Sequence, residues 1–223
     1  MDALTIALPK GRLQKDVLDL FMAVGHGFAE ESALTRKLVI DDDAGRVRYI
    51  LTKPTDVPVF VEYGAADLGV VGQDVLREQE RNLYEPLALG VGRCRLVLAG
   101  PPEARERNLR LASSLRVASK YPKLALRYFQ RQGISAEIIP LDGSIELAPA
   151  VGLADLLVDL VQTGRTLREN NLVEIATILE SQAVLVANRA SYTLKLAAVQ
   201  DIIRKLAAEV ARRAALSPKE RAS

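Results

Sequence analysis

Short apolar runs alternate with amphipathic segments along most of the chain. Residues 4–8 (LTIAL) form a compact apolar run, and a turn at 9–12 separates them from a segment with apolar residues three and four positions apart. The first pattern is typical of a buried strand and the second of a helix. The helical stripe consists of Leu13, Val17, Leu20, Phe21 and Val24, and Gly25 is placed to end the helix.

The same order of elements recurs in the second half. Residues 116–119 predict a strand, Lys120 opens a turn, and a helix is expected from Pro122 until Gly133 ends it. GAADLGVVG at 64–72 and GLADLLVDL at 152–160 share a glycine, an Ala-Asp pair and an apolar strand. Each half therefore reads β-α-β-α-β, which predicts an α/β fold of two similar lobes with a cleft between them. Chance likeness between alternating elements is the alternative.

The lobe boundaries are expected where glycines interrupt the apolar runs, at 89–94, and at a return crossing near 177–183. We predict that lobe I comprises residues 1–90 and 184–223, and that lobe II comprises 91–183. Residues 184–187 would rejoin the first sheet before a long helix. The apolar stripe of that helix is Val199, Ile202, Ile203, Leu206, Ala207 and Val210.

Composition narrows the function classes. The 223 residues contain no apolar run of membrane-spanning length and no basic leader, which predicts a cytoplasmic protein without a membrane segment. A net charge of +2 and 4% aromatic residues argue against nucleic-acid binding, so any anion site must be local. The single Cys94 and the single His26 exclude an internal disulfide and the usual zinc site. We expect Cys94 to be buried and His26 to be a partly exposed structural residue.

The segment 155–170 (DLLVDLVQTGRTLREN) carries the first sign of chemistry. An apolar strand ends in Thr163-Gly164-Arg165-Thr166, where free backbone amides and hydroxyls at a helix start suit a phosphate monoester. Asp159, four residues earlier, could accept hydrogen bonds from ribose hydroxyls. The alternative is a plain turn with Thr166 as the helix N-cap.

Three segments give the chain a resemblance to the short form of ATP phosphoribosyltransferase, the first enzyme of histidine biosynthesis. They are LPKGRL at 8–13, DVPVFVEYGAADLGVVGQDVL at 56–76 and ELAPAVGLADLLVDLVQTGRTLRENNLVEI at 146–175. The resemblance implies a two-lobed fold like that of the type II periplasmic binding proteins. It also implies transfer of phosphoribosyl from phosphoribosyl pyrophosphate (PRPP) to N1 of ATP, with Mg²⁺ carried mainly by the substrate phosphates.

The resemblance implies Arg12 and Arg36 as the catalytic pair that stabilises the departing pyrophosphate. The residue chemistry suits this reaction, because N1 of adenine already has a lone pair and the difficult step needs cations and positioning. Each arginine has an alternative reading. Arg12 could be a solvated residue of a first helical turn, and Arg36 could form a surface ion pair with the acidic run 41–43.

Further positions are implied to bind the substrates. Lys53 stands where relatives usually carry arginine, and it lacks the planar fork of that residue. Asp67 could equally cap a turn, Glu146 could stabilise a helix start capped by Ser144, and Arg165 is expected to contribute only its backbone. The implied set is Lys10, Gly11, Lys53, Asp67, Asp74, Glu146, Asp159, Thr163, Gly164, Arg165, Thr166 and Leu167.

Other function classes and partners follow. A non-catalytic binding module of the solute-receptor type could share the fold, but we find neither an export signal nor a DNA-binding segment. A P-loop or Rossmann enzyme would need a glycine motif that is missing after each expected strand.

The chain ends before a long-form regulatory domain could fit. The resemblance therefore implies a separate regulatory subunit similar to histidyl-tRNA synthetase. We expect this chain to form a homodimer that assembles with this subunit into a hetero-oligomer.

Overall fold

The computed structural model describes residues 3–28, 37–112 and 114–216, which form two compact units. Unit 1 comprises Met1–Gly92 with Gln182–Ser223, and unit 2 comprises Arg93–Ser181. The chain therefore leaves unit 1 once and returns to it once. Among the described residues, no helix combines the length and the apolar character that crossing a bilayer requires.

Unit 1 is built on a six-stranded mixed sheet in the order β2-β3-β1-β4-β11-β5. Its three central strands, β1 (Leu4–Pro9), β3 (Val47–Thr52) and β4 (Leu68–Gly72), run parallel. The other strands pair antiparallel with their neighbours; they are β2 (Val39–Asp41), β11 (Ala183–Ala187) and β5 (Tyr84–Ala88). Parallel neighbours end at the same edge of the sheet, which gathers the turns that follow them.

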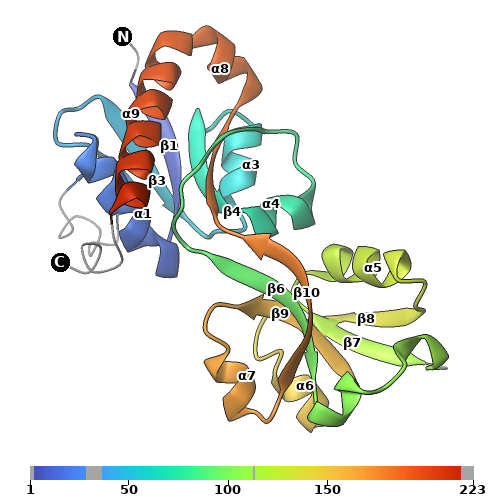
Figure 1. Cartoon of the computed structure of the whole chain (residues 1–223). Helices are drawn as coiled ribbons and strands as arrows, with labels where there is room; N and C mark the ends of the chain where they lie inside the picture. Colours follow the sequence, from blue (N-terminus) through green and yellow to red (C-terminus); the bar gives the residue numbers. More distant parts are fainter. Residues whose placement is uncertain (1–2, 29–36, 113, 217–223) are drawn as a thin grey trace. The chain divides into compact units, whose positions relative to one another are not determined.

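Helices cover both faces of this sheet (Figure 1). On one face, α1 (Arg12–Ala23) and α9 (Leu196–Ala215) pack against Leu4, Ile6 and Leu8. On the other, α3 (Val57–Glu62) and α4 (Gln73–Gln79) pack with Ala7 and Val71. Side chains alternate between the faces because a strand has a period of two. The short α8 (Arg189–Leu194) precedes α9.

Unit 2 has a five-stranded sheet in the order β10-β6-β9-β7-β8. Here β7 (Leu115–Ser119), β8 (Ala136–Pro140) and β9 (Leu156–Val161) are parallel. Two antiparallel strands, β6 (Cys94–Gly100) and β10 (Val173–Ser181), complete the sheet. One face carries α5 (Pro122–Arg131), and the other carries α6 (Leu147–Ala150) and α7 (Arg165–Glu169). Two 3₁₀ turns, η1 (Pro102–Arg105) and η2 (Leu109–Leu111), follow β6.

The predicted order of elements is confirmed in unit 2, which runs β7-α5-β8-α6-β9. Unit 1 follows the same plan with one addition, since β2 forms an antiparallel hairpin with β3. The turn of that hairpin is held by Asp42, whose Oδ1 accepts from the amides of Arg46 (2.6 Å) and Val47 (3.1 Å). The long final helix is confirmed as α9. Its buried stripe of Val199, Ile202 and Leu206 contributes roughly 2 kcal/mol per side chain.

Candidate active site

The carboxyl edge of the unit 1 sheet gathers several of the predicted residues. Lys10, Gly11 and Arg12 follow β1, Lys53 follows β3, and Asp74 follows β4. The amide of Lys10 donates to the Thr52 carbonyl at 2.7 Å, which ties the turn after β1 to the end of β3. The Lys10, Arg12 and Lys53 side chains are exposed. This edge of unit 1 therefore presents three cations to solvent.

Gly11 has a backbone conformation that other residues rarely adopt, with φ 97° and ψ −144°. It occupies the N-cap position of α1, and no side chain of the described residues caps that helix. A helix start without a side-chain cap offers its first amides to an anion, although the Gln14 amide already donates to the Gly11 carbonyl at 3.0 Å. Gly11 thus lets the chain turn sharply from β1 into a helix start flanked by Lys10 and Arg12.

Asp74 is buried in the first turn of α4, and its carboxylate lies back over Gly72 at the end of β4. A Cβ placed on Gly72 would overlap Asp74 Oδ1, so a larger residue at that position would displace the carboxylate. The structure brings Asp74 to the predicted edge. Its role in substrate binding stays a prediction.

Asp67 does not lie at this edge, which corrects its predicted place in the site. It precedes β4 at the opposite end of the sheet, where Oδ2 accepts from the Thr5 amide at 2.8 Å and from Lys195 Nζ at 2.9 Å. Burial alone would raise the pKa of Asp67, but these two donors hold it below its usual value. Asp67 therefore ties the starts of β1 and β4 to the segment before α9.

Arg36 lies outside the described residues, so its catalytic role stays a prediction. The acidic run that offered the alternative partner is engaged elsewhere at two positions. Asp41 forms an ion pair with Arg48 (2.8 Å), and Asp42 closes the hairpin turn described above.

The carboxyl edge of the unit 2 sheet gathers a second group of residues. Lys120 follows β7, Glu146 follows β8, and the loop 162–167 follows β9. Asp159 lies within β9, two residues before its end. Unit 2 therefore places carboxylates, hydroxyls and the cations Lys120 and Arg165 at the edge that corresponds to the cationic edge of unit 1.

Asp159 has the most unusual electrostatic environment of the residues predicted for the site. Burial raises its pKa to about 6, the Leu160 amide (2.8 Å) opposes this rise, and the nearby Glu146 carboxylate adds to it. Lys120 acts in the opposite direction. These effects show that Lys120, Glu146 and Asp159 share one electrostatic environment. A carboxyl group held partly desolvated in this way is typical of a binding or catalytic site.

The loop 162–167 has the conformation expected of an anion-binding turn. Gly164 is the N-cap of α7 with φ 71°, and no side chain of the described residues caps the helix. Leu167 is buried and anchors the loop in the core, while Thr163 and Thr166 are exposed. Arg168 Nη1 donates to the Thr163 carbonyl at 3.1 Å. Leu167 and Arg168 thus hold the backbone of the loop at the start of α7.

Two alternative helix caps proposed from the sequence are wrong. Thr166 is not the N-cap of α7, because Gly164 holds that position and Thr166 lies within the helix. Ser144 does not cap α6, because Glu146 holds the N-cap position there, again without a side-chain capping bond. Arg165 is exposed and pairs with Glu169 at 2.7 Å, which agrees with a role for its backbone only.

Sequence reasoning did not single out Lys120, which follows β7 at this edge and acts on the pKa of Asp159. The buried hydroxyl of Ser119 accepts from the Tyr121 amide (2.9 Å) and donates to the Val158 carbonyl (2.8 Å), which fixes the turn that carries Lys120. The internal repeat could have found it, because Lys120 follows β7 as Lys10 follows β1. Within the described ranges, no group of three or more His, Cys, Asp or Glu side chains could hold a metal ion.

The remaining two candidates lie apart from both edges. Cys94 is buried at the start of β6, as predicted. His26 is also buried, with 5% of its surface exposed, so the expectation of a partly exposed histidine is wrong. His26 is buried by tertiary packing, because α9 and the β2-β3 turn lie over it although it follows the end of α1 in sequence.

Comparison with known proteins places this geometry in a family. The model of the HisG family, ATP phosphoribosyltransferase, matches residues 53–208. A relative named ATP phosphoribosyltransferase, from Caldanaerobacter subterraneus subsp. tengcongensis, is 48% identical over 92% of this chain and 97% of its own length.

Solved structures agree at the level of the fold. The ATP phosphoribosyl transferase (HisG:HisZ) complex from Thermotoga maritima contains a chain 35% identical to this one, with a TM-score of 0.80, covering 94% of this chain and 99% of that one. The periplasmic aliphatic sulphonate binding protein SsuA from Escherichia coli matches at 13% identity and TM-score 0.59 over 95% of this chain and 73% of its own. That match shows the fold alone, a two-lobed type II architecture. With the family model matching more than half of its length, the chain belongs to the ATP phosphoribosyltransferase family.

Proposed function

We propose that this chain transfers the phosphoribosyl group of PRPP to N1 of ATP and releases pyrophosphate, the first step of histidine biosynthesis. The observation that carries the proposal is the carboxyl edge of unit 2. There a glycine-centred loop with exposed hydroxyls lies on the same sheet edge as Glu146 and the partly desolvated Asp159. Phosphate and ribose are the two parts of a phosphosugar that such an arrangement would recognise.

The loop 162–167 would hold the 5-phosphate of PRPP. Its supports are the uncapped first turn of α7, the exposed hydroxyls of Thr163 and Thr166, and the left-handed Gly164, which lets the backbone approach an oxygen closely. Leu167 would keep the loop in place through its burial in the core. Arg165 would contribute its amide, because its side chain pairs with Glu169.

Glu146 and Asp159 would accept hydrogen bonds from the ribose hydroxyls. This role needs Asp159 ionised, and its pKa of about 6 leaves it ionised at neutral pH. A carboxylate next to the ribose also stabilises the positive charge that develops there as pyrophosphate leaves. Lys120 acts as a positioning residue that lowers the energetic cost of ionising Asp159.

The cations of unit 1 would act on the anionic substrate groups. Arg12, with Arg36, would stabilise charge on the departing pyrophosphate, and Lys10, Gly11 and Lys53 would bind phosphate oxygens, with Asp74 as a further substrate contact. N1 of ATP attacks the anomeric carbon with its own lone pair while the bond to pyrophosphate breaks. No general base is assigned, since the nucleophilic nitrogen carries no proton to remove.

Mg²⁺ would enter with the substrate and neutralise its phosphate charge. Within the described residues no group of three or more His, Cys, Asp or Glu side chains could hold a metal ion, and Mg²⁺ typically binds through one or two carboxylates together with substrate phosphates and water. The residues that meet the substrate phosphates would be the cations and loop amides named above.

The chain would work with a regulatory subunit similar to histidyl-tRNA synthetase. The support is its 35% identity with a chain of the Thermotoga maritima HisG:HisZ complex. We propose a homodimer of this chain within such a hetero-oligomer, in the cytoplasm. The non-catalytic binding module is not favoured, because the receptors that match are far more distant than the transferases.

The direct test is formation of N1-(5-phosphoribosyl)-ATP and pyrophosphate from ATP, PRPP and Mg²⁺, with and without the cognate regulatory subunit. We expect product in both cases and more with the subunit. GTP in place of ATP serves as the control for the nucleophile. Failure to form product with ATP in the presence of the subunit would overturn the proposal.

A further inference from the structure

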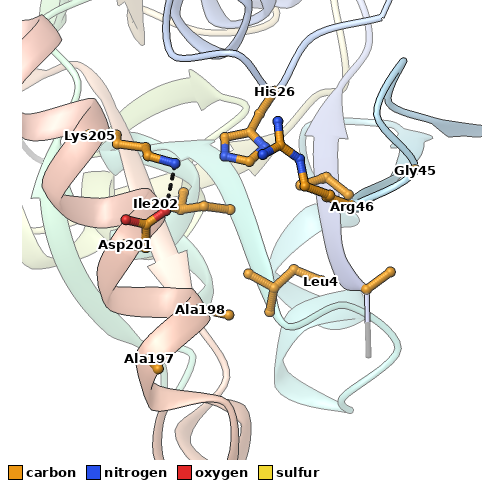
Figure 2. A pocket seen from close by; sticks show the side chains of 11 residues that line it. Leu4, His26, Gly45, Arg46, Ala197, Ala198, Asp201, Ile202 and Lys205 are labelled. Atoms are coloured by element: carbon orange, nitrogen blue, oxygen red, sulfur yellow. Dashed lines mark ion pairs between the residues drawn. The ribbon is translucent and has the colours of Figure 1, made fainter. Parts of the chain in front are cut away.

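Unit 1 contains a cavity at the opposite end of the sheet from the candidate site. It has a volume of about 390 Å³ and lies between the starts of β1 and β3, the β2-β3 turn and helix α9 (Figure 2). This volume is within the range of small-ligand pockets. No predicted site residue lines the cavity.

The two ends of the cavity differ in character. Figure 2 shows Leu4, Ala198 and Ile202 along one part and the polar groups of His26, Arg46 and Lys205 gathered at the other. Leu4 and Ile202 belong to the hydrophobic core, so the apolar wall is rigid. A ligand that fits must therefore combine an apolar body with one polar end.

His26 is the strongest indication that the polar end is a binding site. It is 5% exposed, yet neither of its ring nitrogens has a hydrogen-bond partner among the described residues. Nδ1 lies 3.6 Å from Asp42 Oδ2, a buried oxygen that also lacks a partner, so these two atoms face each other and Nε2 is the nitrogen left for a ligand. Its backbone is held firmly, because its amide donates to Phe21 (2.9 Å) and its carbonyl accepts from the Tyr49 hydroxyl. Buried polar atoms without partners are uncommon in folded proteins.

The charges around His26 favour an anion. Arg46 donates to the Gly25 carbonyl at 3.1 Å and forms no ion pair within the described part of the chain. Lys205 pairs with Asp201 at 2.6 Å, but Asp201 also pairs with Arg204 at 2.6 Å and so is shared. Burial lowers the pKa of His26, Lys205 and Arg46 lower it further, and Asp42 opposes them. Among the residues that line the cavity, the two cations Arg46 and Lys205 therefore outnumber the single carboxylate of Asp201.

We propose that this cavity binds a small organic carboxylate with a compact apolar body. The carboxylate accepts hydrogen bonds from Arg46, Lys205 and the His26 nitrogen that faces away from Asp42. The apolar body packs against Leu4, Ala198 and Ile202. Cations are excluded by the two basic side chains, and among the cavity-lining residues no aromatic ring other than the His26 imidazole is present to stack a nucleobase.

Binding would be coupled to protonation of His26. The charged groups around the imidazole are Asp42 and Arg46 from the β2-β3 turn, and Asp201 and Lys205 from α9. A bound carboxylate adds negative charge, which raises the pKa of His26. The affinity should therefore increase as the pH falls from neutral towards the pKa of free His26, and proton uptake should accompany binding.

The test uses the fact that His26 is the only histidine of the chain. In ¹⁵N-histidine-labelled full-length protein, its imidazole gives a single set of ring signals. We expect benzoate and isovalerate to shift these signals in a saturable way and to raise the fitted pKa of His26. Neutral benzamide at the same concentrations should leave them in place.

Variants locate the site. Lys205→Gln and Arg46→Gln should each weaken benzoate binding at least fivefold, and Ala198→Leu should weaken it by filling the apolar end. Arg212→Gln is the matched control, since Arg212 is exposed on the same helix and pairs with Glu209 outside the cavity.

The proposal is wrong if neither carboxylate shifts the His26 signals, if benzamide or inorganic phosphate shifts them equally, or if all three cavity variants bind benzoate like the wild type. Because the readout is the imidazole itself, these outcomes are independent of whether the chain transfers phosphoribosyl groups.

Discussion

The carboxyl edges of the two sheets share one strand order but carry different chemistry. The parallel strands run β3-β1-β4 in unit 1 and β8-β7-β9 in unit 2, with the first strand of each plan in the middle. Unit 1 presents the exposed cations Lys10, Arg12 and Lys53, whereas unit 2 presents Glu146, Asp159 and a hydroxyl-bearing loop.

This difference teaches that topology decides where side chains converge and that the turn sequences decide what they can bind. A parallel triplet gathers three turns at one edge whatever residues those turns contain. In the proposed reaction a leaving group becomes more anionic while a ribose becomes cationic. Exposed cations suit the first of these charges and carboxylates such as Glu146 and Asp159 suit the second.

The largest expected effect is on the cationic edge. Arg12→Ala should slow the single-turnover chemical step roughly a hundredfold, because one preorganised cation is lost from the leaving group. Arg36→Ala should have a similar effect. Lys15→Ala, an exposed change on the same helix as Arg12, serves as the control. An unchanged single-turnover rate in Arg12→Ala would remove that residue from the chemistry.

Substitutions at the opposite end of the unit 1 sheet should lower the stability of the protein and leave the catalytic rate unchanged. Asp67→Ala leaves the Thr5 amide and Lys195 without their acceptor, so we expect a loss of about 2 kcal/mol in the free energy of unfolding in urea. Because the pKa of Asp67 is lowered in the folded state, the loss should be full above about pH 4 and diminish at lower pH. Asp41→Ala, which removes an exposed pair with Arg48, is the control and should leave the urea midpoint almost unchanged.

In unit 2, alanine substitutions at two glycines distinguish an effect of backbone strain on stability from an effect on substrate binding. Gly164 and Gly133 both have a left-handed backbone, with φ 71° and 67°, so alanine should cost each about 1 kcal/mol of stability. Only Gly164→Ala should also raise the KM for PRPP, by about tenfold, because a loop shifted by strain loses a phosphate contact. A Cβ on Gly133 meets open space at the end of α5. Equal KM values in the two variants would exclude the loop as the phosphate site.

The smallest expected effect is the change in the free energy of unfolding when Asp159 is replaced. Its raised pKa means that the ionised group destabilises the folded state, so Asp159→Asn should increase the free energy of unfolding by about 1 kcal/mol above pH 6. The gain should disappear below about pH 4, where the carboxyl group is protonated in both states. The same variant should bind PRPP more weakly. A variant that is neither more stable at pH 7 nor weaker in binding would show that Asp159 is an ordinary polar residue.

Most of the helices and strands could be predicted from the sequence. So could most of the residues at the carboxyl edges of the two sheets. The β1-α1 and β7-α5 units follow from periodicity and from glycines that end helices, since these signals lie within a few residues of one another. The family segments also located the loop around Gly164. The strand that the apolar residues 38–40 predict is present as β2, but its antiparallel pairing with β3 could not be read from so short a run.

What the sequence determined by itself is therefore the set of elements and the turns that follow the parallel strands. Tertiary structure alone decided that Asp67 pairs with Lys195, 128 positions away, and that His26 is covered by α9 beside Lys205. Such pairings depend on how distant segments pack and not on neighbouring residues. A local sequence pattern cannot specify them, because the contacts that stabilise these pairs form only when distant segments pack together in the folded core.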